Sequence, residues 1–312
     1  MMQEYEKILN QKYEEVYNEL EKEVHSDLPF RIYHYTGASF LQSIIKHKLG
    51  EKAKLWFTKW NFLNDFSELR YIHEVVDNNL HILNDKTPEL YKFLKEINGI
   101  DRALKNDTTF LRYSARENYI LSFSLEPDLL NMWTYYTKSA QNDGYSIGFD
   151  TSELVRSINN ANHITVQCGY VIYDEKEQER IIQKMLSELQ EMYIMLMDNS
   201  DEIKYIRWMI SNCFEDYINL LACYFKHPAF KEEKEIRLVY ENVQNTMWEK
   251  VREKNGLFIP YVELDYDVES IEEVWISPTL QDKHAAYGLN ILGEQYGINW
   301  SINQSKIPFR NI

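Results

Sequence analysis

A histidine at the end of an aromatic stretch is the first residue whose type and position indicate chemistry. His34 precedes Tyr35 and Thr36 at the end of segment 30–35, which has the composition of a β-strand. The next segment, 39–47, has a helical pattern, and a helix N-terminus favours an anionic group such as phosphate. We therefore expect His34, Tyr35 and Thr36 to contact a ligand. The alternative is a hydrogen-bonded histidine at the edge of the core.

A serine and an aromatic segment form the second candidate group. Ser122 lies in a predicted strand over 119–124, and Trp133 and Tyr136 lie in a predicted short helix over 127–136. Aromatic faces can stack on a planar ring such as a nucleobase or nicotinamide. We interpret Ser122, Trp133 and Tyr136 as candidate ligand contacts, although aromatic clusters of this kind also form ordinary core.

The third group is a charged run that enters a strand. Glu233, Glu235 and Arg237 alternate with Lys234 and Ile236, so in an extended strand these three share one face. Two carboxylates beside an arginine are suited to acid–base chemistry or to binding a ribose. A solvated charge run at the start of an edge strand is the alternative.

Several common catalytic signatures are missing from the sequence. It contains no Walker A motif, no G-x-G-x-x-G, no H-E-x-x-H and no G-x-S-x-G. The three cysteines, Cys168, Cys213 and Cys223, form no C-x-x-C pair, so neither a zinc site nor a disulfide framework is predicted. We expect no metal.

The elements that would position these residues follow from the hydrophobic pattern. Apolar residues at helical spacing predict an amphipathic helix over 3–24, and two further helices over about 175–226 predict a helical hairpin. Short strands that do not alternate regularly with helices favour an α+β fold with a small mixed or antiparallel β core. The expected organisation is an N-terminal helix, 1–25, followed by one domain, 26–312, in which the hairpin is an insertion.

The charge of the chain excludes some function classes. It has 34 Lys and Arg against 49 Asp and Glu, a formal charge of −15, which argues against coating nucleic acid. The N-terminal 23 residues lack the apolar core of a signal peptide, and no apolar run approaches the about 18 residues of a membrane span. We expect a cytoplasmic protein without a membrane partner.

Taken in order, these segments resemble a bacterial family known as domain of unknown function 2971. The resemblance covers roughly residues 30–280. The matching pieces are Tyr33-His34-Tyr35-Thr36, Leu63-Asn64-Asp65 with Glu68, Ser122-Phe123-Ser124, 132–136, 144–150, 225–227 and 233–238. Phe66 departs from the pattern, since the family often has Pro after the Asn-Asp pair.

The layout also resembles the core of mono-ADP-ribosyltransferases. That resemblance implies NAD as a substrate, bound through His34, with Tyr35, or Trp133 and Tyr136, stacking on the nicotinamide. It also implies Glu235 as the carboxylate that orients a ribose hydroxyl, with Glu233 completing a Glu-x-Glu pair. A carboxylate stabilises the positive charge that develops on the ribose when the nicotinamide bond breaks. Arg31 or Arg237 would then hold the pyrophosphate.

Three functions remain open at this point. The first is an NAD-dependent ADP-ribosyltransferase or NAD hydrolase that acts as a bacterial toxin or phage-defence effector on a macromolecular acceptor. The second is a non-catalytic module of a defence system that binds a nucleotide, or binds a protein through the N-terminal helix or the helical hairpin. The third, a metal-independent nuclease, conflicts with the acidic charge.

Overall fold

The chain forms two compact units, each assembled from three separate segments. The computed structural model describes residues 2–25, 27–48, 51–63, 68–104, 116–137, 144–199, 202–243, 248–254 and 256–309. The helical unit comprises Met1–Ser26, Leu63–Ala115 and Tyr170–Phe230. The sheet unit comprises Asp27–Phe62, Arg116–Gly169 and Lys231–Ile312. Each unit is described by itself below.

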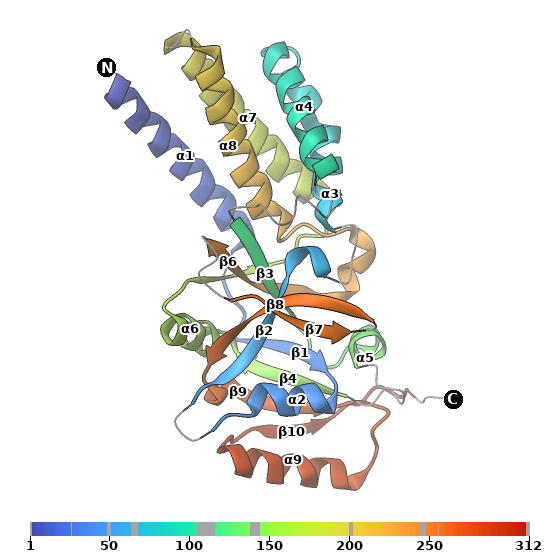
Figure 1. Cartoon of the computed structure of the whole chain (residues 1–312). Helices are drawn as coiled ribbons and strands as arrows, with labels where there is room; N and C mark the ends of the chain where they lie inside the picture. Colours follow the sequence, from blue (N-terminus) through green and yellow to red (C-terminus); the bar gives the residue numbers. More distant parts are fainter. Residues whose placement is uncertain are drawn as a thin grey trace. The chain divides into compact units, whose positions relative to one another are not determined.

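Long helices lie side by side in the helical unit (Figure 1). They are α1 (Met2–Val24), α3 (Glu68–Asn79), α4 (Pro88–Leu104), α7 (Glu175–Asn199) and α8 (Ile203–Ala222), with a 3-10 turn at Leu80–Leu83. α1 packs against α7 and α8, and α3 packs against α4, α7 and α8. The core contains Leu9 and Leu20 of α1 and Leu186 and Leu189 of α7, all fully buried. Burial of one apolar stripe per helix is what stabilises such a bundle.

Both helical predictions are confirmed here. The helix expected over 3–24 is α1, and the hairpin expected over 175–226 is α7 and α8. The N-terminal helix and the expected insertion fall in the same unit, together with α3 and α4. Asn64 and Asp65, the expected cap of the following helix, lie outside the described residues.

The sheet unit carries all the named strands in the described part of the chain and four helices. The strands are β1 (Arg31–Thr36), β2 (Ala53–Lys59), β3 (Arg116–Ser124), β4 (Tyr145–Asp150), β5 (Val166–Tyr170), β6 (Glu235–Val243), β7 (Lys250–Lys254), β8 (Leu257–Tyr266), β9 (Ile271–Ile276) and β10 (Ser301–Gln304). The helices are α2 (Ala38–Ile45), α5 (Leu130–Tyr136), α6 (Thr151–Asn162) and α9 (Lys283–Tyr296), with 3-10 turns at Trp60–Phe62 and Val268–Ser270. A further 3-10 turn, Pro228–Glu233, begins in the helical unit and ends in the sheet unit.

The strands join in one mostly antiparallel sheet. Its order is β10-β9-β4-β1-β3-β2-β8-β7, with β6 paired to both β3 and β5. Along this path β9–β10 is the parallel pair, and the other pairs are antiparallel. The chain is therefore α+β, as the spacing of its strands predicts.

The sheet bends strongly enough to pack against itself. The Phe123 ring of β3 lies 5.7 Å from Phe149 of β4, and Phe149 lies 6.2 Å from Tyr266 of β8. β4 and β8 are separated by β1, β3 and β2 in the strand order, so contact between their side chains requires a folded sheet. α6 packs on both β4 and β8. Packing of these aromatic rings between β4 and β8 stabilises the bend of the sheet.

Three elements were not expected from the sequence. β7, Lys-Val-Arg-Glu-Lys, carries charges on both faces, and its pairing with β8 at the edge of the sheet needs no apolar face. α6 is rich in Asn and Ser, and its start is stabilised by Asp150, whose side chain accepts a hydrogen bond from the Glu153 amide. β10 is short and polar and pairs only with β9 in the described sheet.

Candidate functional site

Strand β3 changes its neighbour in the middle of the sheet. On one edge it pairs with β6 along its length, and on the other it pairs first with β2, at Tyr119 and Ile120, and then with β1, at Ser124. Ser122 lies between these two pairings. Its carbonyl oxygen accepts a hydrogen bond from Nδ1 of His34, at 3.0 Å. The His34 imidazole thus supplies a hydrogen-bond donor to β3 at the point where the partner of β3 changes from β2 to β1.

His34 is held in one neutral tautomer. The pKa of His34 is lowered to about 4, mainly by burial and also by the positive charges of Arg252 and Lys254, against the opposing effect of the bond to Ser122. Since Nδ1 donates to the carbonyl, the ring at neutral pH leaves Nε2 as a hydrogen-bond acceptor. Nε2 of His34 can therefore accept a hydrogen bond from an N–H or O–H group of a ligand, and the neutral ring adds no charge to the site.

A series of rings extends from His34 across three elements. The His34 ring lies 5.5 Å from Phe40 of α2, Phe40 lies 5.4 Å from Trp56 of β2, and Trp56 lies 5.1 Å from Tyr261 of β8. His34, Phe40 and Trp56 are each half-buried. These rings present partly exposed aromatic faces of the kind that planar ligands stack on.

Arg252 of β7 lies over this aromatic series. Its guanidinium carbon is 5.4 Å from the Trp56 ring centre and 5.5 Å from that of Tyr261, and Nη2 donates to Oγ1 of Thr58 at 2.8 Å. Its Nε is buried without a hydrogen-bond acceptor among the described residues. Burial lowers the pKa of the Arg252 guanidinium and of the nearby Lys254 ammonium.

Two lysines, Lys250 and Lys54, differ from Arg252 in having carboxylate partners. Lys250, two residues earlier on β7, contacts Glu263 at 2.5 Å, and Lys54 contacts Asp265 at 2.6 Å. Within the described part of the chain, Arg252 contacts no carboxylate. We call His34, Phe40, Trp56, Arg252, Lys254 and Tyr261 the aromatic–cationic surface.

The expected catalytic carboxylate lies elsewhere. Glu235 forms a buried, bidentate ion pair with Arg237: Nε donates to Oε1 at 2.8 Å and Nη2 to Oε2 at 3.1 Å. Glu235 is in register with Ser124, and Ser124 with Tyr33, so these three side chains share one face of the sheet. His34 follows Tyr33 and projects from the opposite face. The structure does not bring His34 and Glu235 together.

Glu233 does not follow the alternation expected from the sequence. β6 begins at Glu235, and Lys234 has a φ of +47°, in the left-handed region. Glu233 therefore belongs to the preceding 3-10 turn, where its Oε1 accepts a hydrogen bond from Oη of Tyr136 at 3.0 Å. β6 is also an internal strand, paired with β3 and β5, so the edge-strand alternative is wrong.

The other aromatic candidates are part of the core. Trp133 is 2% exposed, its ring lies 4.8 Å from Tyr35, and its Nε1 donates to Asp128 at 2.7 Å. Tyr35 donates from Oη to the carbonyl of Glu126 at 2.8 Å. Both polar groups are satisfied inside the protein, so stacking of Trp133 on a ligand would require these contacts to break.

Arg31 and Thr36 also have protein partners. Arg31 forms ion pairs with Glu272 and Glu273 of β9, the second at 2.9 Å, so its charge is already balanced. Thr36 is buried and pairs with Tyr145 of β4. Neither residue lies among those that form the aromatic–cationic surface.

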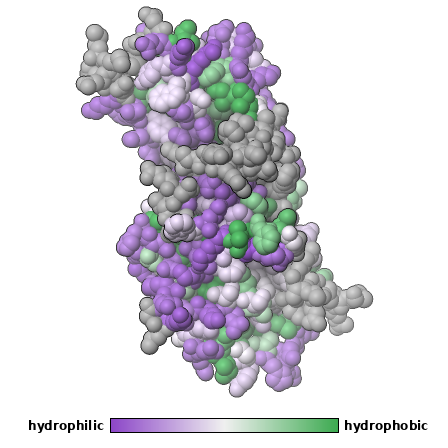
Figure 2. Space-filling model, viewed as in Figure 1, coloured by the Kyte–Doolittle hydropathy of each residue, from purple (hydrophilic) through white to green (hydrophobic). Residues whose placement is uncertain are grey.

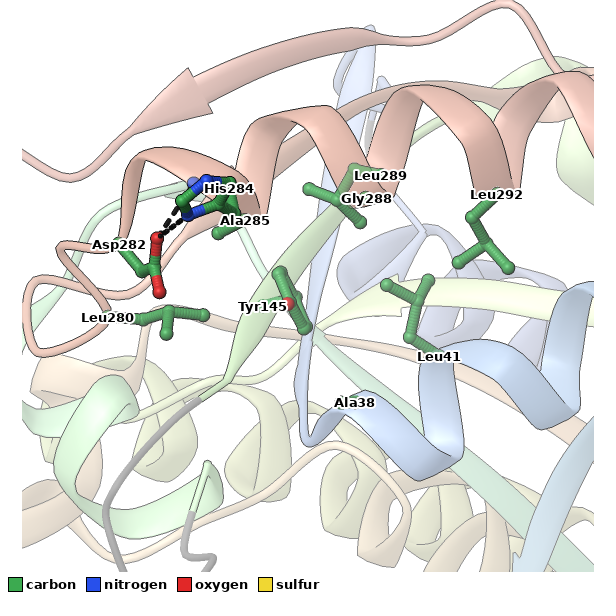
Figure 3. A pocket seen from close by; sticks show the side chains of 10 residues that line it. All are labelled: Ala38, Leu41, Tyr145, Leu280, Asp282, His284, Ala285, Gly288, Leu289 and Leu292. Carbon is green, nitrogen blue, oxygen red and sulfur yellow. Dashed lines mark hydrogen bonds and ion pairs between the residues drawn. The ribbon is translucent and has the colours of Figure 1, made fainter.

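A separate hollow of about 270 Å³ lies between α2, the start of β4 and α9 (Figure 3). Its lining is mostly aliphatic, including Leu41, Leu289 and Leu292. At one end the Asp282 carboxylate accepts hydrogen bonds from the backbone N–H and Nδ1 of His284, both at 2.8 Å, and so caps α9. The polar groups satisfy each other, and none of the residues expected from the sequence lines this hollow.

The described residues contain no group of three or more His, Cys, Asp or Glu side chains placed to hold a metal ion. None of the described helices has the length and apolarity needed to span a bilayer.

Sequence reasoning missed most of the aromatic–cationic surface. The signal was present in the hairpin formed by β7 and β8: an Asn-Gly pair at 255–256 between two alternating segments is a strong hairpin pattern. Had that hairpin been recognised, Arg252 and Lys254 would have been placed on one face of a strand. Their position beside Trp56 depends on the pairing of β2 with β8, which a single sequence does not show.

Comparison with known proteins gives one match. No curated protein and no solved structure matches the chain. Residues 132–238, from α5 into β6, match the model of a family described as a protein of unknown function, DUF2971, which confirms over this segment the family resemblance expected from the sequence.

Proposed function

We propose that the sheet unit binds a nucleotide through the aromatic–cationic surface, with NAD as the first ligand to test. The observation that carries this proposal is Arg252, a half-buried cation stacked over Trp56 and Tyr261 without a carboxylate partner in the described residues. Burial of an unpaired charge is costly, and protein arginines in such positions normally have a counter-ion. A ligand phosphate would supply it.

The surface offers complementary groups for the other parts of a nucleotide. The half-buried rings of Phe40 and Trp56 are available to a planar base, and Lys254 adds a second positive charge. Nε2 of His34 is available to accept a hydrogen bond from a ribose hydroxyl or an exocyclic amine. Recognition of phosphate by arginine is strong because the guanidinium can donate two parallel hydrogen bonds.

The proposal concerns binding first and catalysis second. ADP-ribosyl transfer or NAD hydrolysis needs a carboxylate beside the ribose. Glu235 is held by Arg237 and Glu233 by Tyr136, which favours a nucleotide-binding module over an NAD-consuming effector. For this chain to act as an enzyme, Glu235 would have to separate from Arg237, or Glu233 from Tyr136, when the ligand binds.

Isothermal titration calorimetry with NAD, ADP and ADP-ribose tests the binding site. The Arg252→Gln variant should bind each ligand about tenfold or more weakly, because a charge-assisted phosphate contact is lost. Arg156→Gln is the matched control: it removes the same charge from an exposed arginine of α6 that is paired with Glu153. Equal affinity of wild type and Arg252→Gln, or no binding of any of the three ligands at millimolar concentration, would reject the site.

A second assay separates binding from turnover. Wild type and Glu235→Gln are incubated with NAD, and release of nicotinamide is followed over hours. We expect binding without release. Release that Glu235→Gln abolishes, in a variant shown to be folded, would instead establish the enzyme.

A further inference from the structure

The negative charge of the chain is concentrated in one of its units. The helical unit has 16 Lys and Arg against 27 Asp and Glu, a formal charge of −11. The sheet unit has 18 against 22, a formal charge of −4. A surface with this excess of carboxylates attracts basic partners and repels anionic ones.

An apolar groove lies between α1 and α7 of the helical unit. It has a volume of about 340 Å³, and its apolar lining consists of Ile8 of α1 and Met192 and Met195 of α7. Ile8 is 49% exposed. Met192 and Met195 are one helical turn apart on α7, but Met192 is 1% exposed, so Ile8 and the half-buried Met195 supply the accessible apolar surface of the groove. Methionine side chains are flexible and adapt to the shape of a partner.

The polar rim of this groove is acidic. Lys12 contacts Glu188 at 2.5 Å and Glu191 at 3.4 Å, so its charge is balanced within the protein. Glu15 accepts a hydrogen bond from Gln11 and has no cation among its described contacts. One lysine against Glu15, Glu188 and Glu191 leaves the rim with a negative charge.

Further exposed apolar side chains lie at the C-terminal end of α7 and the start of α8, outside the lining of the groove. They are Ile194, Met197, Ile203 and Trp208, each more than 40% exposed. In Figure 2 hydrophobic residues interrupt a largely hydrophilic surface near the helix ends at the top of the view. An apolar groove with a charged rim is typical of a protein-binding surface.

We propose that this groove binds a basic amphipathic helix of a partner protein. A helix fits a groove between two helices, with apolar residues one turn apart, at i and i+3 or i+4, against Ile8 and Met195. Lysine or arginine on its flanks would pair with Glu15 and Glu191. A second copy of this chain would bring two units of charge −11 together, and an anionic membrane or a nucleic acid would be repelled. The site is independent of the nucleotide proposal, since it uses no residue of the sheet unit.

The test uses fluorescence anisotropy with a labelled peptide of about 14 residues, four turns of helix, that carries Leu on one face and Lys on the other. The full chain should bind it, and a scrambled peptide of the same composition should bind more weakly. Ile8→Gln should weaken binding about fivefold, because an apolar contact at the groove is removed, and Glu191→Lys should weaken it by a similar factor through charge. Ile291→Gln, a matched change at an exposed isoleucine of α9, should have no effect.

The outcomes decide between the groove and its alternatives. Equal binding of the scrambled peptide, or equal binding by Ile8→Gln and wild type, would show attraction by charge alone and overturn the proposal. Light scattering of the chain without peptide tests whether a second copy of the chain occupies the groove. A dimer that Ile8→Gln dissociates would also overturn the proposal, in favour of self-association.

Discussion

Removal of one partner of the buried pair formed by Glu235 and Arg237 should destabilise the protein more than removal of one partner of an exposed ion pair. Arg237 is 1% exposed and Glu235 is 5% exposed, and two parallel hydrogen bonds join them. Glu235→Leu removes the carboxylate and leaves the guanidinium buried. Loss of one partner of a buried ion pair costs about 3–5 kcal/mol of unfolding free energy.

The Gln variant should lie between Leu and wild type. It keeps the shape and one acceptor oxygen, but it loses the charge and places an N–H group opposite one N–H of Arg237. The expected loss is about 1.5–3 kcal/mol, the contribution of a charge-assisted hydrogen bond. The double variant Glu235→Leu with Arg237→Met should be less destabilised than the sum of the two single variants, since neither charge remains buried without the other.

Urea unfolding followed by circular dichroism measures the overall effect. Because the chain has two units, one transition need not describe both, so hydrogen exchange of peptides from β3 and β6 provides the local measurement. Faster exchange in β3 and β6 but not in α7 is the expected result for Glu235→Leu. Unchanged exchange in these strands, or full additivity in the double variant, would refute the assignment of Glu235 to a structural ion pair.

Two further predictions follow from the sheet unit. The pKa of His34 is lowered to about 4 in the folded state, so the stability that depends on its neutral form should be complete above about pH 6.5 and should decrease as the pH falls from there toward 4. NMR titration of the imidazole should show no protonation at pH 6, and a titration midpoint near 6.5 would contradict the buried position. Gly144→Ala should destabilise the chain by about 1–3 kcal/mol through overpacking, because its Cβ would lie 2.7 Å from the carbonyl oxygen of Thr36. Gly288→Ala in α9, where a Cβ meets nothing within 4 Å, should be neutral or stabilising in the same urea experiment, and equal losses at the two glycines would refute the steric argument.

The elements were predictable where hydrophobic pattern determines them. The helix over 3–24 and the strands 145–150 and 271–276 are α1, β4 and β9, because each buries a regular apolar set. β7 was not predictable by the same means, since an edge strand with charges on both faces buries little. The general position of His34 at the end of a strand was also predictable from its aromatic neighbours.

The relation between candidate residues was not predictable, because it depends on register. Glu235 and His34 lie on opposite faces, which follows from the pairing of Ser124 with both Tyr33 and Glu235. A shift of one residue in either pairing would reverse this result. The left-handed backbone at Lys234 likewise ends the alternation that placed Glu233 beside Glu235 in the sequence. Neither the strand register nor the backbone conformation at Lys234 is indicated by the local sequence.

The division of charge is consistent with two proposed binding surfaces of opposite sign on one acidic chain. With a formal charge of −15 spread evenly, an unpaired arginine would lie in a field that repels phosphate. The sheet unit instead has a charge of only −4, and Lys250 of β7 and Lys54 of β2 are paired with Glu263 and Asp265. The potential at Arg252 is therefore set by its immediate neighbours, since exposed charges beyond about 10 Å are largely screened at 0.1 M salt. Binding of a nucleotide should weaken with added salt as a local contact does, and binding of a basic helix should weaken more steeply, because it depends on many carboxylates at once.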